Sequence, residues 1–326
     1  MNRLNQILVG LLVVQLVVVG VLFWPRSTAS VEAQSLFPGV TSDAIVGLTI
    51  TGSDGQSIRL AKNNGAWVLP EAEDYPVVAD KVPTFLDKIT GLKTERLVTQ
   101  TSASHRRLKV AEDSYERLIE FEMNDGTVHR LYLGSSAGYS AIHVRAEGQD
   151  QVYLASGLSA LDAGVAATDW VDTAYLSIPR DQIVTLTLEN KNGLFEFEKS
   201  GDTWTMKGLA EGETLNQTGV ESLISRAGSV TLTKPLGKGE QPSYGLQQPT
   251  AVVTVRMHSE EAGDKTVTLR VGAKDPADNS YVVISSESPY YVRVSEYAVK
   301  DFVEKARDGF LQLPPTPTPE GTPGSP

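Results

Sequence analysis

The chain has no cysteine among its 326 residues. That absence excludes disulfide bonds, thiolate metal sites, cysteine nucleophiles and lipidation at an N-terminal cysteine. Basic residues are also few, with 29 lysines and arginines against 40 acids. Of all these charged residues only Arg3 and Arg26 lie before residue 27, so the rest of the chain has a net charge of −13. Such an acidic surface disfavours nucleic acids and anionic lipid headgroups as partners.

The sequence also lacks the short motifs of common catalytic sites. It has no Walker loop, no glycine-rich dinucleotide fingerprint and no G-x-S-x-G nucleophile elbow. The four histidines never occur at the H-x-x-x-H or H-E-x-x-H spacing of a zinc site, and they are His105, His129, His143 and His258. We therefore assign no catalytic, cofactor-binding or metal-binding residue and expect no enzymatic activity.

Two acidic features resemble sites but have simpler structural explanations. The loop Asp275–Ser280 is rich in oxygen side chains, yet it lacks the spacing of a calcium-binding loop. It lies between two predicted strands, where Asp, Pro and Asn are common turn formers. Glu120 and Glu122 share one face of a predicted strand, as residues on a solvent-exposed face also do.

One basic and one aromatic feature are equally ambiguous. The run His105-Arg106-Arg107 suits the docking of an anion, but it also suits a solvated loop. Trp67 and Trp204 have the chemistry of sugar-stacking platforms, but they occupy equivalent places in two similar segments. Equivalent placement favours packing in a core.

An apolar run near the N-terminus predicts a membrane anchor. Ile7 to Trp24 is eighteen residues without a charge, and a helix of that length spans roughly 27 Å, close to the thickness of a bilayer core. We expect residues 1–26 to form a short cytoplasmic N-terminus and a single transmembrane span, retained as a signal-anchor in a bacterial cytoplasmic membrane. The bulk of the chain is then extracytoplasmic. Cleavage is the alternative, since Val31-Glu32-Ala33 loosely resembles a signal-peptidase site.

An internal repeat with an offset of 138 residues dominates the remainder. The strand-like pattern of residues 45–50 returns at residues 183–188. The helical set Val82, Phe85, Leu86 and Ile89 returns as Val220, Leu223, Ile224 and Ala227, and Leu108 and Gly134 return as Leu246 and Gly272. So many apolar positions in one register indicate a duplicated domain.

The repeat sets the predicted domain organisation. Residues 27–42 are small and polar and are predicted to tether the anchor to the first domain. The two repeats cover residues 43–177 and 178–313, joined by a hinge at Trp170–Asp181. Residues 314–326 contain six prolines and are predicted to form an extended, disordered tail.

Each repeat is predicted to fold as an α+β domain. It begins with a meander of three antiparallel strands, followed by one amphipathic helix with its N-cap at Asp80 or Thr218. Further antiparallel strands and a short closing helix end each repeat, near Leu158–Leu161 in the first and Tyr297–Lys305 in the second.

This order of elements resembles bacterial proteins that carry domain of unknown function 4340. The residues that carry the resemblance are Val46–Ile50, Trp67–Leu69, Val184–Leu188, Trp204–Met206 and Tyr244-Gly245-Leu246. The first repeat departs from the last element, with Arg106-Arg107-Leu108 in its place. The resemblance implies an envelope protein encoded beside ABC transporter subunits of the gliding-motility type, and it implies no catalytic residues.

Three functions from different classes follow as hypotheses. The leading one is a non-enzymatic, membrane-anchored extracytoplasmic accessory or interaction protein of an ABC-type transport system, with permease or ATPase subunits as partners and no nucleic acid. The alternative is a solute- or glycan-binding protein that holds its ligand between the repeats, in a deep cleft lined by aromatic residues. A hydrolase acting on envelope polymers would need a cluster of acids in such a cleft.

Overall fold

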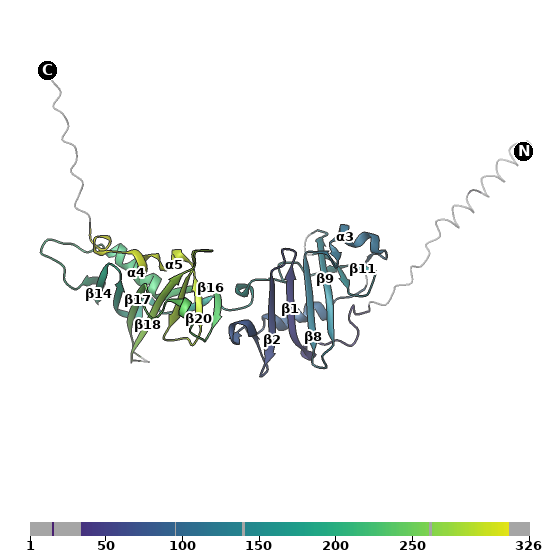
Figure 1. Cartoon of the computed structure of the whole chain (residues 1–326), viewed down its shortest axis with the longest axis horizontal. Coiled ribbons are helices and arrows are strands. Elements are labelled where there is room, and N and C mark those ends of the chain that lie inside the picture. Colours follow the sequence, from purple (N-terminus) through teal and green to yellow (C-terminus); the bar gives the residue numbers. More distant parts are fainter. Residues whose placement is uncertain (1–14, 16–33, 95, 139–140, 261–262, 313–326) are drawn as a thin grey trace, which may run out of the picture.

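Two sheet-rich domains lie side by side along the long axis of the molecule (Figure 1). The computed structural model describes residues 15, 34–94, 96–138, 141–260 and 263–312. Each domain contains one nine-stranded sheet in which every described pair of neighbouring strands is antiparallel. The expected architecture of mostly antiparallel sheets with few helices is confirmed.

The predicted anchor at Ile7 to Trp24 lies, apart from Gln15, outside the described residues, and so does the predicted tail at residues 314–326. Within the described part of the chain, no helix is both long enough and apolar enough to cross a bilayer.

The first sheet has the strand order β4-β3-β2-β1-β8-β9-β10-β11-β5. These strands are β1 (Ile45–Gly52), β2 (Ser57–Asn63), β3 (Ala66–Leu69), β4 (Tyr75–Pro76), β5 (Leu97–Thr99), β8 (Arg117–Met123), β9 (Val128–Ser136), β10 (Ala141–Ala146) and β11 (Val152–Ser156). A separate small hairpin consists of β6 (Val110–Ala111) and β7 (Ser114–Tyr115). The helical segments are η1 (Ser42–Ala44), η2 (Pro70–Ala72), α2 (Lys81–Thr90), η3 (Ser102–Ser104), α3 (His105–Leu108) and η4 (Ala167–Asp169).

The second sheet has the order β12-β16-β20-β19-β18-β17-β13-β14-β15. Its strands are β12 (Ala174–Ser177), β13 (Ile183–Asn190), β14 (Gly193–Ser200), β15 (Thr203–Met206), β16 (Ser229–Gly237), β17 (Ala251–Ser259), β18 (Gly263–Lys274), β19 (Tyr281–Ser285) and β20 (Tyr291–Val294). The helical segments are η5 (Arg180–Gln182), α4 (Gln217–Gly228), η6 (Pro242–Tyr244), α5 (Glu296–Glu304) and η7 (Arg307–Phe310).

The two sheets share one strand order over eight positions. From β3 to β5 the first sheet runs β3-β2-β1-β8-β9-β10-β11-β5, and the second runs β15-β14-β13-β17-β18-β19-β20-β16. Strands at matching places are those related by the 138-residue offset of the sequence, such as β1 and β13. The sheets differ only at their outermost strands, which are β4 in the first and β12 in the second.

The N-terminal end of the first domain extends into the segment predicted to be a tether. Leu36 and Phe37 are buried, and the Leu36 N–H donates to the Leu92 carbonyl at 2.8 Å. Ser35 forms an isolated antiparallel bridge with Lys93, much as Ala174 of β12 pairs with Thr231 of β16. Residues 34–42 therefore pack as part of the first domain.

The predicted amphipathic helices cover the inner face of each sheet. All four apolar residues predicted for α2 and all four predicted for α4 are buried. The N-cap of α4 is Asn216, whose side chain accepts from the Gly219 N–H at 3.0 Å, and not Thr218, which lies inside the helix. Asp80 occupies the N-cap position of α2, but its side chain makes no capping hydrogen bond.

The closing helix is found in the second domain, as α5, but not in the first. Residues 159–162 form a turn in which the Asp162 carboxylate accepts hydrogen bonds from the backbone and hydroxyl of Ser159, at 2.8 and 2.7 Å. Leu161 is 91% exposed, so this segment has no apolar stripe to bury. In contrast, α5 buries Val299, Phe302 and Val303, which supplies the packing that a short helix needs.

A short segment packs on the outer face of each sheet. In the first domain this segment brings Leu108 and Val110 against Tyr132 and Val152, and in the second it brings Tyr244 and Leu246 against Val282. The close approach depends on a strand glycine. A Cβ on Gly134 would lie 2.1 Å from the Leu108 carbonyl oxygen, and one on Gly272 would lie 2.0 Å from that of Tyr244.

We therefore expect Gly134→Ala and Gly272→Ala each to destabilise the protein by about 3 kcal/mol, because the new methyl group meets backbone that must shift. Urea unfolding of each variant measures the loss. Gly309→Ala is the matched control, since its added Cβ meets only the flexible side chain of Lys305, at 3.2 Å. Equal midpoints for all three variants would contradict the proposed close packing.

Candidate functional site

A single acidic side chain joins the two domains. Glu73 follows η2 in the first domain, and its carboxylate accepts from the backbone N–H groups of Lys238 and Gly239 in the second, at 2.9 and 3.2 Å. Glu73 and Asp74 both have left-handed backbone conformations, with φ of 51° and 62°. Two successive non-glycine residues in this region are uncommon and carry a strain that the surrounding contacts must offset. We call these contacts, together with those of Tyr290 below, the junction latch.

Tyrosines complete the junction latch. The Tyr290 hydroxyl of the second domain donates to the Asp74 carbonyl at 2.8 Å, and its ring lies edge-on to Tyr75 with centroids 4.7 Å apart. The Tyr175 hydroxyl in turn donates to the Tyr290 carbonyl at 2.7 Å. Burial, with smaller contributions from neighbouring tyrosines and Asp172, raises the pKa of Tyr75 to about 12. Each domain thus supplies both aromatic surface and hydrogen bonds to the contact.

The predicted hinge at Trp170–Asp181 begins in packed core. Trp170 is buried and lies edge-on to Phe85 at 5.4 Å, and its indole N–H donates to the Gly164 carbonyl at 2.9 Å. Its own carbonyl accepts from the Val78 N–H at 2.9 Å. The start of the connection between the domains is therefore fixed by burial and by hydrogen bonds.

Beside the junction latch lies a groove with walls from both domains. Ser57, Ile58 and Arg59 of β2 form one wall, and Thr233, Lys234 and Pro235 of β16 form the other. The groove has a volume of about 510 Å³. We call it the junction groove.

The junction groove has an apolar floor and a polar rim. Ile58, Leu69 and Ala72 are buried at its base, with Val165 half-buried beside them. Arg59, Lys234 and the acid Glu71 are exposed at the rim, and neither cation forms an ion pair with any described residue. None of the described residues that line the groove is aromatic. An apolar centre within a polar rim is the usual anatomy of a protein interface.

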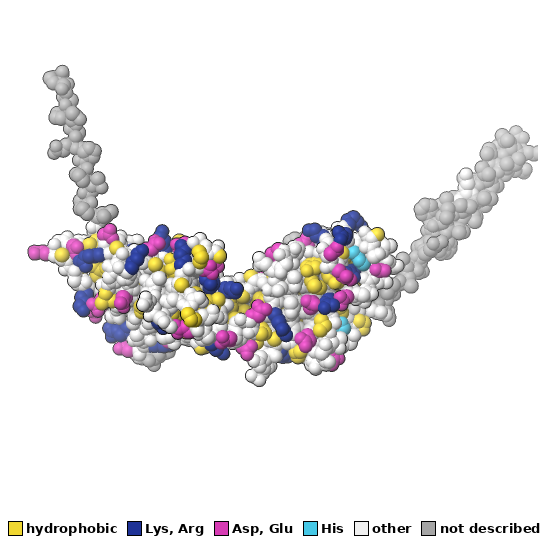
Figure 2. Space-filling model, viewed as in Figure 1, with side chains coloured by type: hydrophobic (Ala, Val, Ile, Leu, Met, Phe, Trp, Pro, Cys, Tyr) yellow, Lys and Arg dark blue, Asp and Glu magenta, His cyan; other side chains and the backbone are white. Residues whose placement is uncertain are grey.

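Charged side chains of both signs are spread over the visible surface. Figure 2 shows acidic and basic side chains mixed over both lobes of the molecule. Many of these charges are paired across short distances, for example Arg130 with Glu120 at 2.6 Å. Exposed pairs of this kind contribute little to stability.

The acidic loop predicted as a weak calcium candidate is a structural turn. Asp275 accepts from the Ala277 N–H at 2.9 Å and pairs with Arg293 at 2.7 Å, and Asp278 accepts from the Ser280 N–H at 2.9 Å. Within the described ranges, no three or more His, Asp or Glu side chains are grouped so that they could hold a metal ion.

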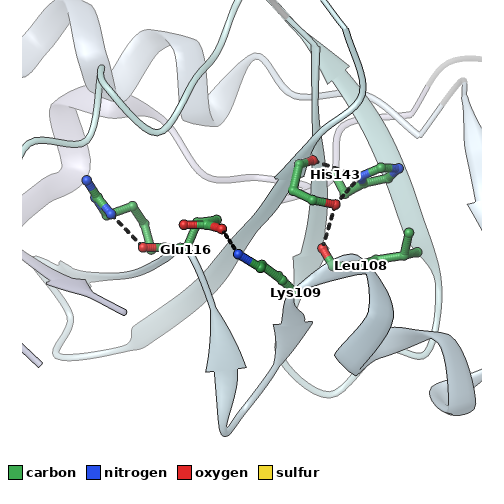
Figure 3. A network of polar contacts seen from close by, with 6 residues as sticks. Leu108, Lys109, Glu116 and His143 are labelled. Carbon is green, nitrogen blue, oxygen red and sulfur yellow. Dashed lines mark hydrogen bonds and ion pairs between the residues drawn. The ribbon is translucent and has the colours of Figure 1, made fainter. Parts of the chain in front are cut away.

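The basic run and two of the histidines belong to the outer face of the first sheet. His105 is buried with its Nε2 2.9 Å from the Asp150 carbonyl, whereas Arg106 pairs with Asp113 on the surface. Figure 3 shows Lys109 paired with Glu116 nearby, and the Nδ1 of His143 lying 2.8 Å from the Ser135 carbonyl. These contacts hold the outer segment on the sheet, and the structure gives them no other role.

An arginine also holds each outer segment, buried in the first domain and half-buried in the second. Arg145 lies over the Tyr132 ring and donates to the Val110 carbonyl at 2.6 Å. In the second domain Arg270 donates to the Leu246 carbonyl. The two arginines come from different strands, β10 and β18. Residues at non-equivalent positions of the two repeats therefore both donate to a carbonyl of the outer segment.

The remaining sequence candidates lie apart from the junction groove. Trp67 and Trp204 are buried at 7% and 5% exposure, as predicted for core residues. Glu120 pairs with Arg130 on the outer face, while Glu122 is exposed. His129 stacks on Phe121 with ring centroids 5.2 Å apart. The structure brings none of these residues together in one site.

Sequence reasoning missed the residues of the junction latch and the junction groove. One usable signal was Pro70, because proline after a short strand ends its ladder pairing. No signal pointed to Glu73 or Tyr290, since ordinary acidic and aromatic residues identify a cross-domain contact only once the domains are placed.

The comparisons with known proteins agree with the resemblance noted in the sequence. The family model described as domain of unknown function (DUF4340) matches residues 67–234. The chain belongs to this family. The DUF4340 match begins at Trp67 in β3 and ends at Lys234 in β16. It therefore includes Glu73 of the junction latch and Lys234 of the junction groove, but not Tyr290 or the β2 wall. Neither the curated proteins nor the solved structures contain a match.

The junction latch predicts that the spacing between the domains depends on Glu73 and Tyr290. The chain has no cysteine, so a protein with the two substitutions Ser53→Cys and Lys300→Cys carries spin labels only at these positions, one on each domain. We expect one narrow distance distribution for the parent protein and a broad one for Glu73→Ala with Tyr290→Phe. Glu71→Ala, two residues away and without a contact across the latch, should leave the distribution narrow. A narrow distribution in the double variant would mean that core packing alone fixes the domains.

The raised pKa of Tyr75 predicts a loss of stability at high pH. Between pH 10 and 12 the unfolded chain releases the Tyr75 proton while the folded protein keeps it, so the free energy of unfolding falls as pH rises. Tyr75→Phe should remove about 1–2 kcal/mol of that fall. Urea unfolding at pH 9 and pH 11.5 measures the difference. Tyr297→Phe, at a residue 75% exposed, should leave the slope unchanged, and equal slopes for both variants would contradict the assignment.

Proposed function

We propose that this DUF4340 protein is a membrane-anchored extracytoplasmic accessory protein of an ABC-type transport system, which acts by binding other proteins and not by catalysis. The observation that carries the proposal is the junction groove. The groove has an apolar floor at Ile58, Leu69 and Ala72, and its rim cations Arg59 and Lys234 form no ion pair with a described residue. Such a surface suits a protein partner better than a small solute.

The arrangement of the domains also supports a binding role. Two sheets of the same strand order are held at a fixed spacing by Glu73 and Tyr290, which gives the groove walls a defined geometry. A preorganised groove binds a partner without the cost of ordering its own walls. We further infer that the two sheets are tandem copies of one ancestral unit, in keeping with the 138-residue offset.

Binding of a solute or glycan between the repeats is the second candidate. The position of the groove between the domains favours it, because interdomain clefts are common ligand sites. The chemistry of the lining is less favourable, since no aromatic ring lines the groove and the tyrosines of the junction are packed against one another. We therefore rank this function below protein binding.

Crosslinking of the full-length protein in its own membrane tests the accessory role. We expect mass spectrometry of the purified crosslinks to recover permease or ATPase subunits of an ABC transporter reproducibly. A second single-span membrane protein of similar abundance, carried through the same procedure, controls for non-specific capture. Failure to recover any transporter subunit from well-solubilised material would contradict the proposal and favour the solute-binding function.

A further inference from the structure

We propose that the junction groove binds an extended peptide segment of a partner protein, which adds to the edge of β2 and places acidic side chains beside Arg59 and Lys234. This inference rests on the proposed interaction function and names the kind of partner. Three independent observations point to a peptide in strand conformation.

Along the groove, no strand in the described part of the chain pairs with the edge of β2. Ser57 to Leu60 pair with β1 on one side, but the register with β3 covers only Ala61 to Asn63. The cause lies in the sequence, because Pro70 turns the chain into η2 directly after β3. Ser57, Ile58 and Arg59 then face the groove along a strand edge. A strand edge of this kind is a template for main-chain hydrogen bonds from another chain.

The opposite wall is also a strand edge, of a different kind. β12 pairs with β16 at Ser229–Thr231, and the Leu232 N–H donates to the Thr173 carbonyl at 2.9 Å. Among the described strands, residues 233–237 pair with β20 alone. Pro235 sits in this stretch and has no N–H to donate, which is a common way to stop an edge strand from pairing. We therefore assign the main-chain pairing to β2 and the side-chain contacts to β16.

The charges and the floor define the side chains of the peptide. In a strand, alternate side chains point in opposite directions, so one set can reach Ile58, Leu69 and Ala72 while the other meets the rim. Arg59 and Lys234 stand on opposite walls, and no described residue forms an ion pair with either. A peptide with alternating apolar and acidic residues would place apolar side chains on the floor and carboxylates beside the rim cations. Glu71 also lines the groove, so its lining carries two cations and one acid. Against the acidic background of the chain, this net positive charge favours carboxylates.

Selection from a random peptide library tests the inference, because it lets the groove choose its own sequence. A phage-displayed library of random eight-residue peptides is selected against the full-length protein in nanodiscs. We expect binders with alternating apolar and acidic residues, whose affinity falls about tenfold or more for the double variant Arg59→Glu with Lys234→Glu. The matched control, Lys191→Glu with Lys300→Glu, makes the same charge change at two exposed lysines outside the groove and should alter affinity less than about twofold.

Two further measurements on a selected peptide test the strand pairing. N-methylation of alternate amides should weaken binding about tenfold, because it removes main-chain donors. Hydrogen exchange at Ser57 and Arg59 should slow when the peptide is added, because alternate amides of β2 face the free edge while those of Ile58 and Leu60 face β1. A selection that yields no binder sensitive to the groove variant, or a peptide indifferent to N-methylation, overturns the inference.

The outcomes separate this inference from the accessory role. Equal recovery of transporter subunits by the parent protein and by the Arg59→Glu, Lys234→Glu variant, together with selected peptides that ignore the groove, would overturn the peptide site and leave the accessory role intact. Groove-dependent peptides without any transporter subunit in the crosslinks would support the site and overturn the named partner system.

Discussion

The contact between the domains centres on one carboxylate. Glu73 reaches from the end of η2 to two backbone N–H groups of the other domain, and it does so from a left-handed conformation that costs energy for a residue with a Cβ. The hydrogen bond from Tyr290 to the neighbouring Asp74 carbonyl helps to hold that conformation. Because the junction groove takes one wall from each domain, its width depends on these contacts together with the apolar core that the two domains share.

The repeated elements could be predicted from the sequence because their cause is local. Alternation at residues 45–50 and 183–188 produced β1 and β13, and the helical spacing after Val82 and Val220 produced α2 and α4. The failure at Leu158–Leu161 has a local cause too, since four residues without an apolar stripe prefer a turn held by Asp162. Periodicity is informative only where a segment is long enough to bury one face.

The candidate site could not be predicted in this way, since no residue of the junction groove is distinctive on its own. Arg59 and Lys234 are 175 positions apart in the chain, and only the docking of one domain on the other brings them to one rim. For the outer segments, the sequence identified the residues but not their role. Gly134 and Gly272 matched in the repeat, but their purpose became clear only when carbonyl groups were found against them.

The repeat also explains why the contact between domains is made once. The second domain docks on the first through the β16 side of its sheet, and the topological equivalent of β16 in the first domain is β5, whose Leu97 and Val98 are about half exposed, at 45% and 42%. At the offset of 138 residues, however, Tyr75 corresponds to Glu213 and Tyr290 to Val152. Glu213 is paired with Arg307, and Val152 is buried in β11. A third domain of the same fold could not dock at the free sheet edges by the same contacts. The two sheets share their strand order, but the residues of the junction latch are not repeated at the equivalent positions. Divergence at a few positions, and not a change of fold, therefore makes the junction groove unique among the sheet edges that the structure describes.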